Sequence, residues 1–130
     1  MIGDVLSPEM ERIATQIVDA AFRVHTELGP GLLESIYEEC LAHELAKRGL
    51  RVERQVAVPV FYDGVRVNAD LRLDLLVEGQ VIIEVKAVEK LIPVFEAQLL
   101  TYLKLSGKRL GFLVNFNVPV IKNGIKRIIR

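Results

Sequence analysis

Apolar residues recur at helical spacing in the first part of the chain. After Ser7-Pro8, a strong helix start with serine as N-cap and proline at the first helical position, apolar side chains repeat every three or four residues. Gly29-Pro30-Gly31 interrupts this pattern, which predicts a first helix over residues 8–28. A second stretch predicts a helix over residues 32–48, which Gly49 would end.

Strand-like apolar runs follow the second helix. Asp63-Gly64 is a strong signal for a two-residue hairpin turn, and Glu78-Gly79 is a weaker one. These turns divide the segment into three predicted strands: Val52–Tyr62, Val65–Val77 and residues 81–87. A meander of antiparallel strands is therefore expected in the middle of the chain.

The last part of the chain returns to a helix and then to strands. Pro93 and Gly107 bracket a predicted helix over residues 94–105, and Leu110–Asn115 is typical of a buried strand. Residues 118–121 and 125–129 flank Asn123-Gly124 and predict a terminal hairpin. The order ααβββαβββ indicates one α/β domain over residues 1–130, with a mostly antiparallel sheet covered by helices.

Three charged side chains interrupt the strands at residues 65–77 and 81–87. Glu84 and Lys86 are two positions apart on one strand and therefore share a face. Asp74 lies opposite Glu84 only if residues 78–80 form a three-residue loop or if a bulge corrects the register. A two-residue turn would send Asp74 to the other face. Because charges among apolar residues are costly unless they are paired or bind a metal, this pattern needs a physical reason.

The residue types suggest a divalent-cation site. Carboxylates of Asp74 and Glu84 are hard oxygen ligands of the kind that Mg²⁺ or Mn²⁺ prefers, and the backbone carbonyl of Val85 lies between the two side chains of its strand. Lys86 is placed to orient an attacking water or to stabilise developing negative charge. The alternative is a partly buried Glu84–Lys86 ion pair that only fixes strand register.

Two helices carry further polar residues at matching spacing. Gly31, Glu34 and Tyr37 recur every three residues and lie near one helical face, and Gln98 and Tyr102 share a face of the third helix. The alternatives are a solvent-facing Glu34, which suits the helix dipole, and a Tyr102 that belongs to the core or to an amphipathic surface.

Composition narrows the class of protein without deciding it. The chain has 130 residues, of which 51% are hydrophobic and 26% charged, with zero net charge and a single cysteine, Cys40. One cysteine excludes an internal disulfide or a multi-cysteine metal site, and no apolar run approaches the roughly 20 residues of a membrane span. With no secretory-type start, a cytoplasmic protein that does not engage a membrane is expected.

Charge is unevenly distributed along the chain. No acidic residue follows Glu96, whereas seven basic residues do: Lys104, Lys108, Arg109, Lys122, Lys126, Arg127 and Arg130. This basic tail either neutralises phosphates beside the acidic site or forms a solubilising rim.

The motifs together resemble a known family. Residues 31–37, with Gly31, Glu34 and Tyr37, resemble the signature of the GxxExxY proteins of the PD-(D/E)XK nuclease superfamily. The resemblance extends from about Ile17 to residues 124–127. Asp74, followed ten positions later by Glu84-Val85-Lys86 and then by Gln98 and Tyr102, is similar to RecB-like nuclease domains.

The resemblance implies a restriction-endonuclease-like fold, in which a mixed central sheet is flanked by helices. It implies that Asp74 and Glu84 bind Mg²⁺ or Mn²⁺, that Glu34 completes the metal site and that Lys86 is the catalytic lysine. Gln98 and Tyr102 would support the site or contact the substrate.

Three hypotheses of function follow. The first is a metal-dependent nuclease acting on nucleic acid, DNA in preference to RNA. The second is a catalytically silent nucleic-acid- or protein-binding module of the same fold, and the third is a structural homodimer with a vestigial site. A domain of this size is expected to need a second copy or a protein partner to bind a duplex, with the terminal hairpin as its interface.

Overall fold

The computed structural model describes residues 5–130 and contains three α-helices, five strands and a short 3₁₀ helix. The helices are α1 (Pro8–Leu28), α2 (Glu34–Lys47) and α3 (Pro93–Ser106), and the 3₁₀ helix is η2 (Ile121–Gly124). The strands are β1 (Val52–Tyr62), β2 (Val65–Val77), β3 (Val81–Lys86), β4 (Leu110–Asn115) and β5 (Ile125–Ile129). Each of the three predicted helices is therefore confirmed, with bounds shifted by at most two residues.

The strands form one sheet in the order β1-β2-β3-β4-β5. All neighbouring pairs are antiparallel except β3 and β4, which are parallel. Parallel neighbours need a crossover connection, and α3 supplies it. The predicted mixed, mostly antiparallel sheet with flanking helices is confirmed.

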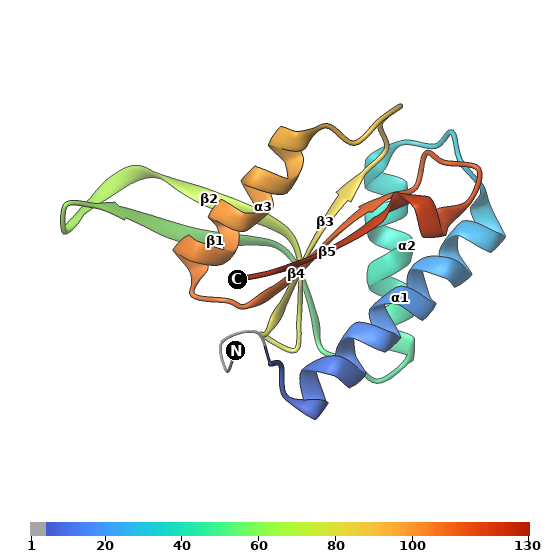
Figure 1. Cartoon of the computed structure of the whole chain (residues 1–130), viewed down its shortest axis with the longest axis horizontal. Helices are drawn as coiled ribbons and strands as arrows, with labels where there is room; N and C mark the ends of the chain where they lie inside the picture. The colour runs from blue at the N-terminus through green and yellow to red at the C-terminus, as the bar shows by residue number, and fades with distance from the viewer. Residues whose placement is uncertain (1–4) are drawn as a thin grey trace.

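Helices cover both faces of the sheet, so the protein has three layers (Figure 1). One core lies between the sheet and the helices α1 and α2, and includes Ile17, Leu41, Ile83 and Phe112. A smaller core lies under α3, where Leu99 and Leu103 pack against sheet residues such as Ile82 and Leu113. Burial of the two apolar faces of the sheet stabilises this arrangement.

The first helix begins where the sequence predicts. The Ser7 hydroxyl accepts a hydrogen bond from the Met10 N–H at 3.1 Å, and Pro8 occupies the first turn, where its missing N–H costs nothing. Gly29 ends the helix with its N–H bonded to the His25 carbonyl at 2.8 Å. Helix α2 then starts at Glu34, so this acid lies in its first turn.

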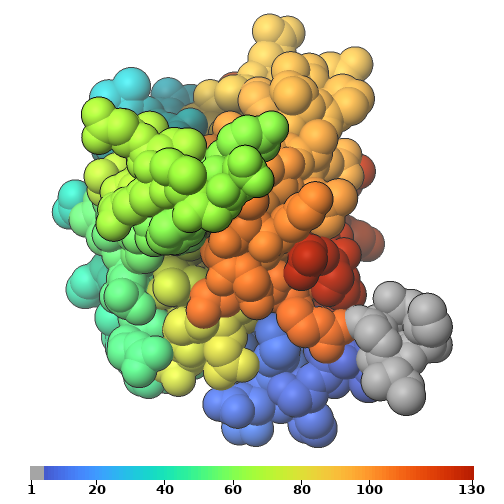
Figure 2. All heavy atoms as spheres, turned by 90° about the vertical axis from the view of Figure 1, so that its left-hand side faces the viewer, coloured from blue at the N-terminus to red at the C-terminus, as the bar shows by residue number. Residues whose placement is uncertain are grey.

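Strands β1 and β2 extend beyond the rest of the sheet as a two-stranded arm, residues 56–73. The Asp63-Gly64 turn at its tip has positive φ at both positions, 53° and 74°, as a two-residue hairpin turn of the predicted kind requires. Figure 2 looks onto the tip of the arm and shows it standing beside α3. Phe61, Tyr62 and Val65 near the tip are exposed.

The predicted terminal hairpin is wrong in its first strand. Residues 118–120 form bends, and η2 follows, so the order of elements is ααβββαββ. Pro119 has no N–H to donate to a ladder, and Ile121 is buried against the core from within the 3₁₀ helix rather than from a strand. Within residues 5–130, no helix is both long enough and apolar enough to cross a membrane.

Candidate active site

Strands β2 and β3 separate at the position of the two predicted acidic ligands. Their ladder pairs Val77 with Val81 and Leu75 with Ile83, which leaves residues 78–80 as a three-residue loop. This register is the one that the metal-site hypothesis requires, because the next pair along the ladder would be Asp74 and Glu84. The sequence-based expectation for the loop is confirmed.

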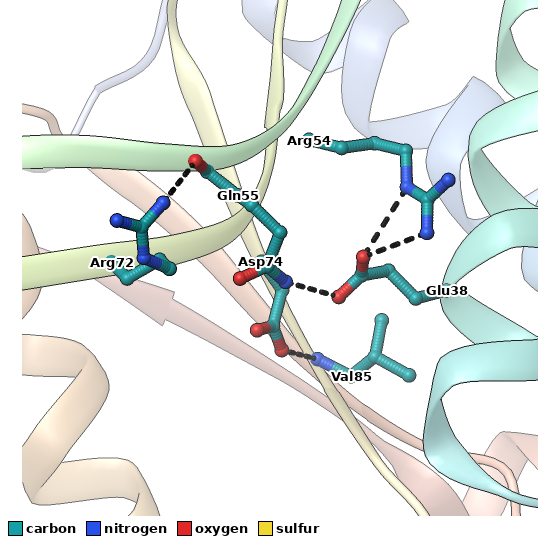
Figure 3. Close-up of polar contacts among 6 residues, drawn as sticks. All are labelled: Glu38, Arg54, Gln55, Arg72, Asp74 and Val85. Carbon is teal, nitrogen blue, oxygen red and sulfur yellow. Dashed lines mark hydrogen bonds and ion pairs between the residues drawn. The ribbon is translucent and has the colours of Figure 1, made fainter.

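Beyond this point, side-chain carboxylates replace backbone carbonyls as the hydrogen-bond acceptors between β2 and β3. The Glu84 carboxylate accepts the Asp74 N–H at 3.0 Å. The Asp74 carboxylate accepts the Val85 N–H at 2.8 Å (Figure 3). These bonds satisfy backbone donors that the diverging strands leave without a ladder partner. One oxygen of each carboxylate makes these bonds, which leaves Oδ1 of Asp74 and Oε1 of Glu84 for another partner.

Burial makes the two carboxylates costly to ionise. Glu84 is 4% exposed, and its burial, followed by the nearby charge of Asp74, raises its pKa from 4.5 to about 8. Burial also raises the pKa of Asp74, although the hydrogen bond from the Val85 N–H acts in the opposite direction. Two neighbouring acids of like charge, one buried and one half-buried, favour protonation or a bound cation, which would remove the repulsion between them.

Lys86 follows Glu84 on the same face of β3 but does not neutralise it by direct contact. Its ammonium lies 4.7 Å from the centroid of the Phe95 ring, on α3, in a cation–π arrangement. Among the ion pairs of residues 5–130, none joins Lys86 to Glu84. The alternative of a register-fixing Glu84–Lys86 ion pair is therefore wrong.

Glu34 approaches the site from the first turn of α2. Its pKa is raised first by burial and then by the charge of Asp74, while the charge of Lys86 lowers it. Glu34 is exposed, as the alternative expected, and the charges of Asp74 and Lys86 still act on its carboxyl.

The aromatic and amide residues of the motif separate into two groups. Tyr102 is half-buried against the smaller core, and burial and then the charges of Glu84 and Asp74 raise its pKa. Gln98 lies one turn earlier on α3 and is exposed. The fully buried Tyr37, by contrast, donates to the Gly29 carbonyl at 2.6 Å and holds the loop that leads into α2.

Two residues beside Asp74 were not predicted from the sequence. Glu38, one turn after Glu34 on α2, is buried and accepts hydrogen bonds from Arg54 and Gln55 of β1 (Figure 3). The spacing of four residues from Glu34 was the available signal for Glu38. Nothing in the sequence distinguishes Gln55, which reaches the site because β1 lies next to β2.

One comparison with known proteins gave a match. A family model described as the PD-(D/E)XK nuclease superfamily matches residues 11–128, a span that contains all five strands but the last residue of β5 and every site residue described above. The chain belongs to the PD-(D/E)XK nuclease superfamily. Neither the curated proteins nor the solved structures compared with it gave a match.

Members of this superfamily generally use divalent metals. Within residues 5–130, no three His, Cys, Asp or Glu side chains stand close enough together to hold a metal ion. Mg²⁺, however, is commonly held by one or two carboxylates and several waters. Because the N–H and C=O of a strand residue point to the same side, the Val85 carbonyl faces the same gap as the Asp74 carboxylate that its N–H contacts.

Three arginines of the basic tail of this superfamily member lie away from the site. Arg127 pairs with Glu11 of α1 through two hydrogen bonds of 3.0 and 2.9 Å. Arg109 and Arg130 lie where β4 begins and β5 ends, whereas Lys86 pairs with Asn115 at the other end of β4. Glu84 pairs with Leu113, four residues or roughly 13 Å along β4 from Arg109. The Arg109 side chain instead donates to the Arg130 and Val5 carbonyls, so it does not contact the carboxylates.

Proposed function

We propose that this protein is a divalent-metal-dependent nuclease that hydrolyses phosphodiester bonds of nucleic acid, DNA in preference to RNA. The observation that carries the proposal is the pair of carboxylates at the point where β2 and β3 separate, the half-buried Asp74 and the buried Glu84, with Lys86 next along the same face. Membership of the PD-(D/E)XK superfamily supports the reaction class.

Each residue has a definite role in this proposal. Asp74, Glu84 and the Val85 carbonyl would hold Mg²⁺ or Mn²⁺, and Glu34 would complete the site from α2. When bound, the cation supplies a more acidic water and neutralises charge on the phosphate. The Lys86 ammonium, anchored over Phe95, is positioned to stabilise the negative charge that develops in the transition state.

The remaining motif residues surround this centre. Gln98 and Tyr102 would contact the substrate from α3, where Gln98 is exposed and Tyr102 half-buried. Tyr37 supports Glu34 indirectly: its hydroxyl fixes the loop before α2, and Glu34 lies in the first turn of that helix. This link between the glycine loop and the tyrosine of residues 31–37 favours assignment to the GxxExxY subgroup. A homodimer or protein partner for duplex binding, and a cytoplasmic location, stay predictions.

The test combines metal binding with cleavage. Titration calorimetry with Mn²⁺ and Mg²⁺ is run on the wild type, on Asp74→Ala/Glu84→Ala and on Lys86→Ala, while nicking of plasmid DNA and labelled DNA and RNA oligonucleotides is followed in parallel. We expect the double variant to lose both metal binding and cleavage. Lys86→Ala should bind metal but lose cleavage by a factor of at least about 10².

A matched control removes two exposed acids from the helices, Asp19→Ala/Glu39→Ala, and should retain both activities. Metal binding by the wild type without cleavage of any substrate would favour the nucleic-acid- or protein-binding module. If the wild type binds neither metal at millimolar concentration, the nuclease proposal fails.

A further inference from the structure

Glu38 is a buried carboxylate whose two oxygens are both occupied by neighbours on β1. Its Oε1 accepts a hydrogen bond from Gln55 Nε2 at 2.8 Å, and its Oε2 accepts from Arg54 Nη2 at 3.1 Å and Nε at 3.3 Å (Figure 3). The side chain of Glu38 is 8% exposed. Because both oxygens are engaged, Glu38 is a partner for β1 rather than an additional free ligand for a cation.

Gln55 holds a backbone conformation that L residues seldom adopt. Its φ is +52°, in the left-handed region, although it lies in the middle of β1. The pairs Arg54 with Leu75 and Val56 with Leu73 on either side place it opposite Asp74. Strain of this kind at an interior strand position persists only where surrounding contacts hold it, and it concentrates at functional sites.

Two contacts hold Gln55 in this conformation. Arg72 of β2 donates to the Gln55 carbonyl at 2.8 Å, and the Glu38 carboxylate accepts from the Gln55 side chain (Figure 3). An ionised carboxylate can accept hydrogen bonds but cannot donate them. Glu38 therefore fixes which end of the Gln55 amide faces α2. The NH₂ group of Gln55 therefore points toward the acidic residues Glu38 and Asp74.

The Gln55 side chain also lies beside Asp74, the residue opposite it on β2 (Figure 3). Its polar hydrogens lower the pKa of the Asp74 carboxyl against the effect of burial. An amide nitrogen carries two hydrogens, so one can bind Glu38 while the other faces Asp74. Together with the Val85 N–H on Oδ2, this contact restrains the plane of the Asp74 carboxylate.

We propose that Glu38 and Gln55 are positioning residues for Asp74: Glu38 fixes the Gln55 amide, and the amide holds the Asp74 carboxylate in the orientation that a divalent cation needs. The inference rests on the proposed metal-dependent function and deepens it. Residues that orient metal ligands typically change metal affinity by about 10- to 100-fold when they are mutated.

The experiment measures Mn²⁺ affinity and metal-free thermal stability of the same variants. Gln55→Gly removes the amide and also removes the strain, because glycine adopts positive φ freely. Glu38→Gln keeps the volume but no longer dictates the orientation of the Gln55 amide. We expect the Kd for Mn²⁺, from calorimetry, to rise about 100-fold in Gln55→Gly and about 10-fold in Glu38→Gln.

Thermal unfolding separates positioning from a merely structural role. The metal-free midpoint of Gln55→Gly should equal or exceed that of the wild type, even though its metal affinity is lower. Gln80→Gly, which changes the same residue type in the loop at the far end of the β2–β3 ladder, should leave the Kd unchanged.

The outcomes distinguish this inference from the function on which it rests. Wild-type Mn²⁺ affinity in both Gln55→Gly and Glu38→Gln would overturn the positioning roles and leave the nuclease proposal intact. Weakened affinity in Gln80→Gly to the same degree would also overturn them. Absence of Mn²⁺ binding by the wild type would overturn both proposals together.

Discussion

Replacing Glu84 by glutamine should stabilise the metal-free protein at high pH and leave its stability unchanged at low pH. The folded protein raises the pKa of Glu84 from 4.5 to about 8, mainly because the side chain is buried and then because Asp74 is close. The folded state therefore holds a proton that the unfolded chain has already released between these two values. Stability is complete below about pH 4.5 and falls as the pH rises toward 8.

The size of the effect follows from the same two values. Each pH unit between 4.5 and about 8 costs about 1.4 kcal/mol, which gives roughly 5 kcal/mol over the whole interval. Typical domains have a free energy of unfolding of about 5–15 kcal/mol, so the loss is a large fraction of the total. Glutamine keeps the shape of the side chain and an oxygen that can accept the Asp74 N–H, but it has no proton to lose in this range.

Urea unfolding of both proteins in EDTA, at pH 5 and pH 9, measures this difference. We expect the two free energies of unfolding to agree within about 1 kcal/mol at pH 5 and the variant to be several kcal/mol more stable at pH 9. The control Glu53→Gln, at an exposed position of β1, should change stability by no more than about 0.5 kcal/mol at either pH. A gap between wild type and Glu84→Gln that is the same at both pH values would refute the argument.

Two further predictions concern the parts of the fold that support the site. Tyr37→Phe removes a hydroxyl that donates to the Gly29 carbonyl and accepts the Leu32 N–H, so it should cost about 1–3 kcal/mol in urea unfolding; an unchanged midpoint would show that the loop holds without the hydroxyl. Gly124→Ala would place a methyl group 2.1 Å from the Asn115 carbonyl oxygen, so the backbone must shift and the thermal midpoint should fall by at least about 5 °C. A thermal midpoint within about 1 °C of the wild-type value would contradict this close approach.

The site was predictable from sequence where its geometry depends on strand periodicity. Asp74 and Glu84 can share a face only across a loop of odd length or with a bulge, and the three-residue loop is the register that the structure has. The turn at Asp63-Gly64 was equally predictable from the sequence, because few dipeptides favour positive φ at two successive positions.

The rest depends on contacts between segments distant in sequence. Gln55 is an ordinary polar residue of a strand until Glu38 and Arg72 are placed around it, and its left-handed conformation has no local signature. The error at residues 118–121 has the same origin. Residues 118–121 form a continuous apolar run, as a buried strand does, but Gly124 packs against the end of β4 and the segment turns into a 3₁₀ helix instead.

The arm formed by β1 and β2 joins the site only at its base. Its turn at Asp63-Gly64 lies about ten residues, or roughly 30 Å, along β2 from Asp74. Exposed turns of this kind tolerate insertions, because they carry few contacts with the rest of the fold. The length and sequence of the tip can therefore change without moving a carboxylate of the site. The distance that the arm extends and the chemistry of the site can thus vary independently.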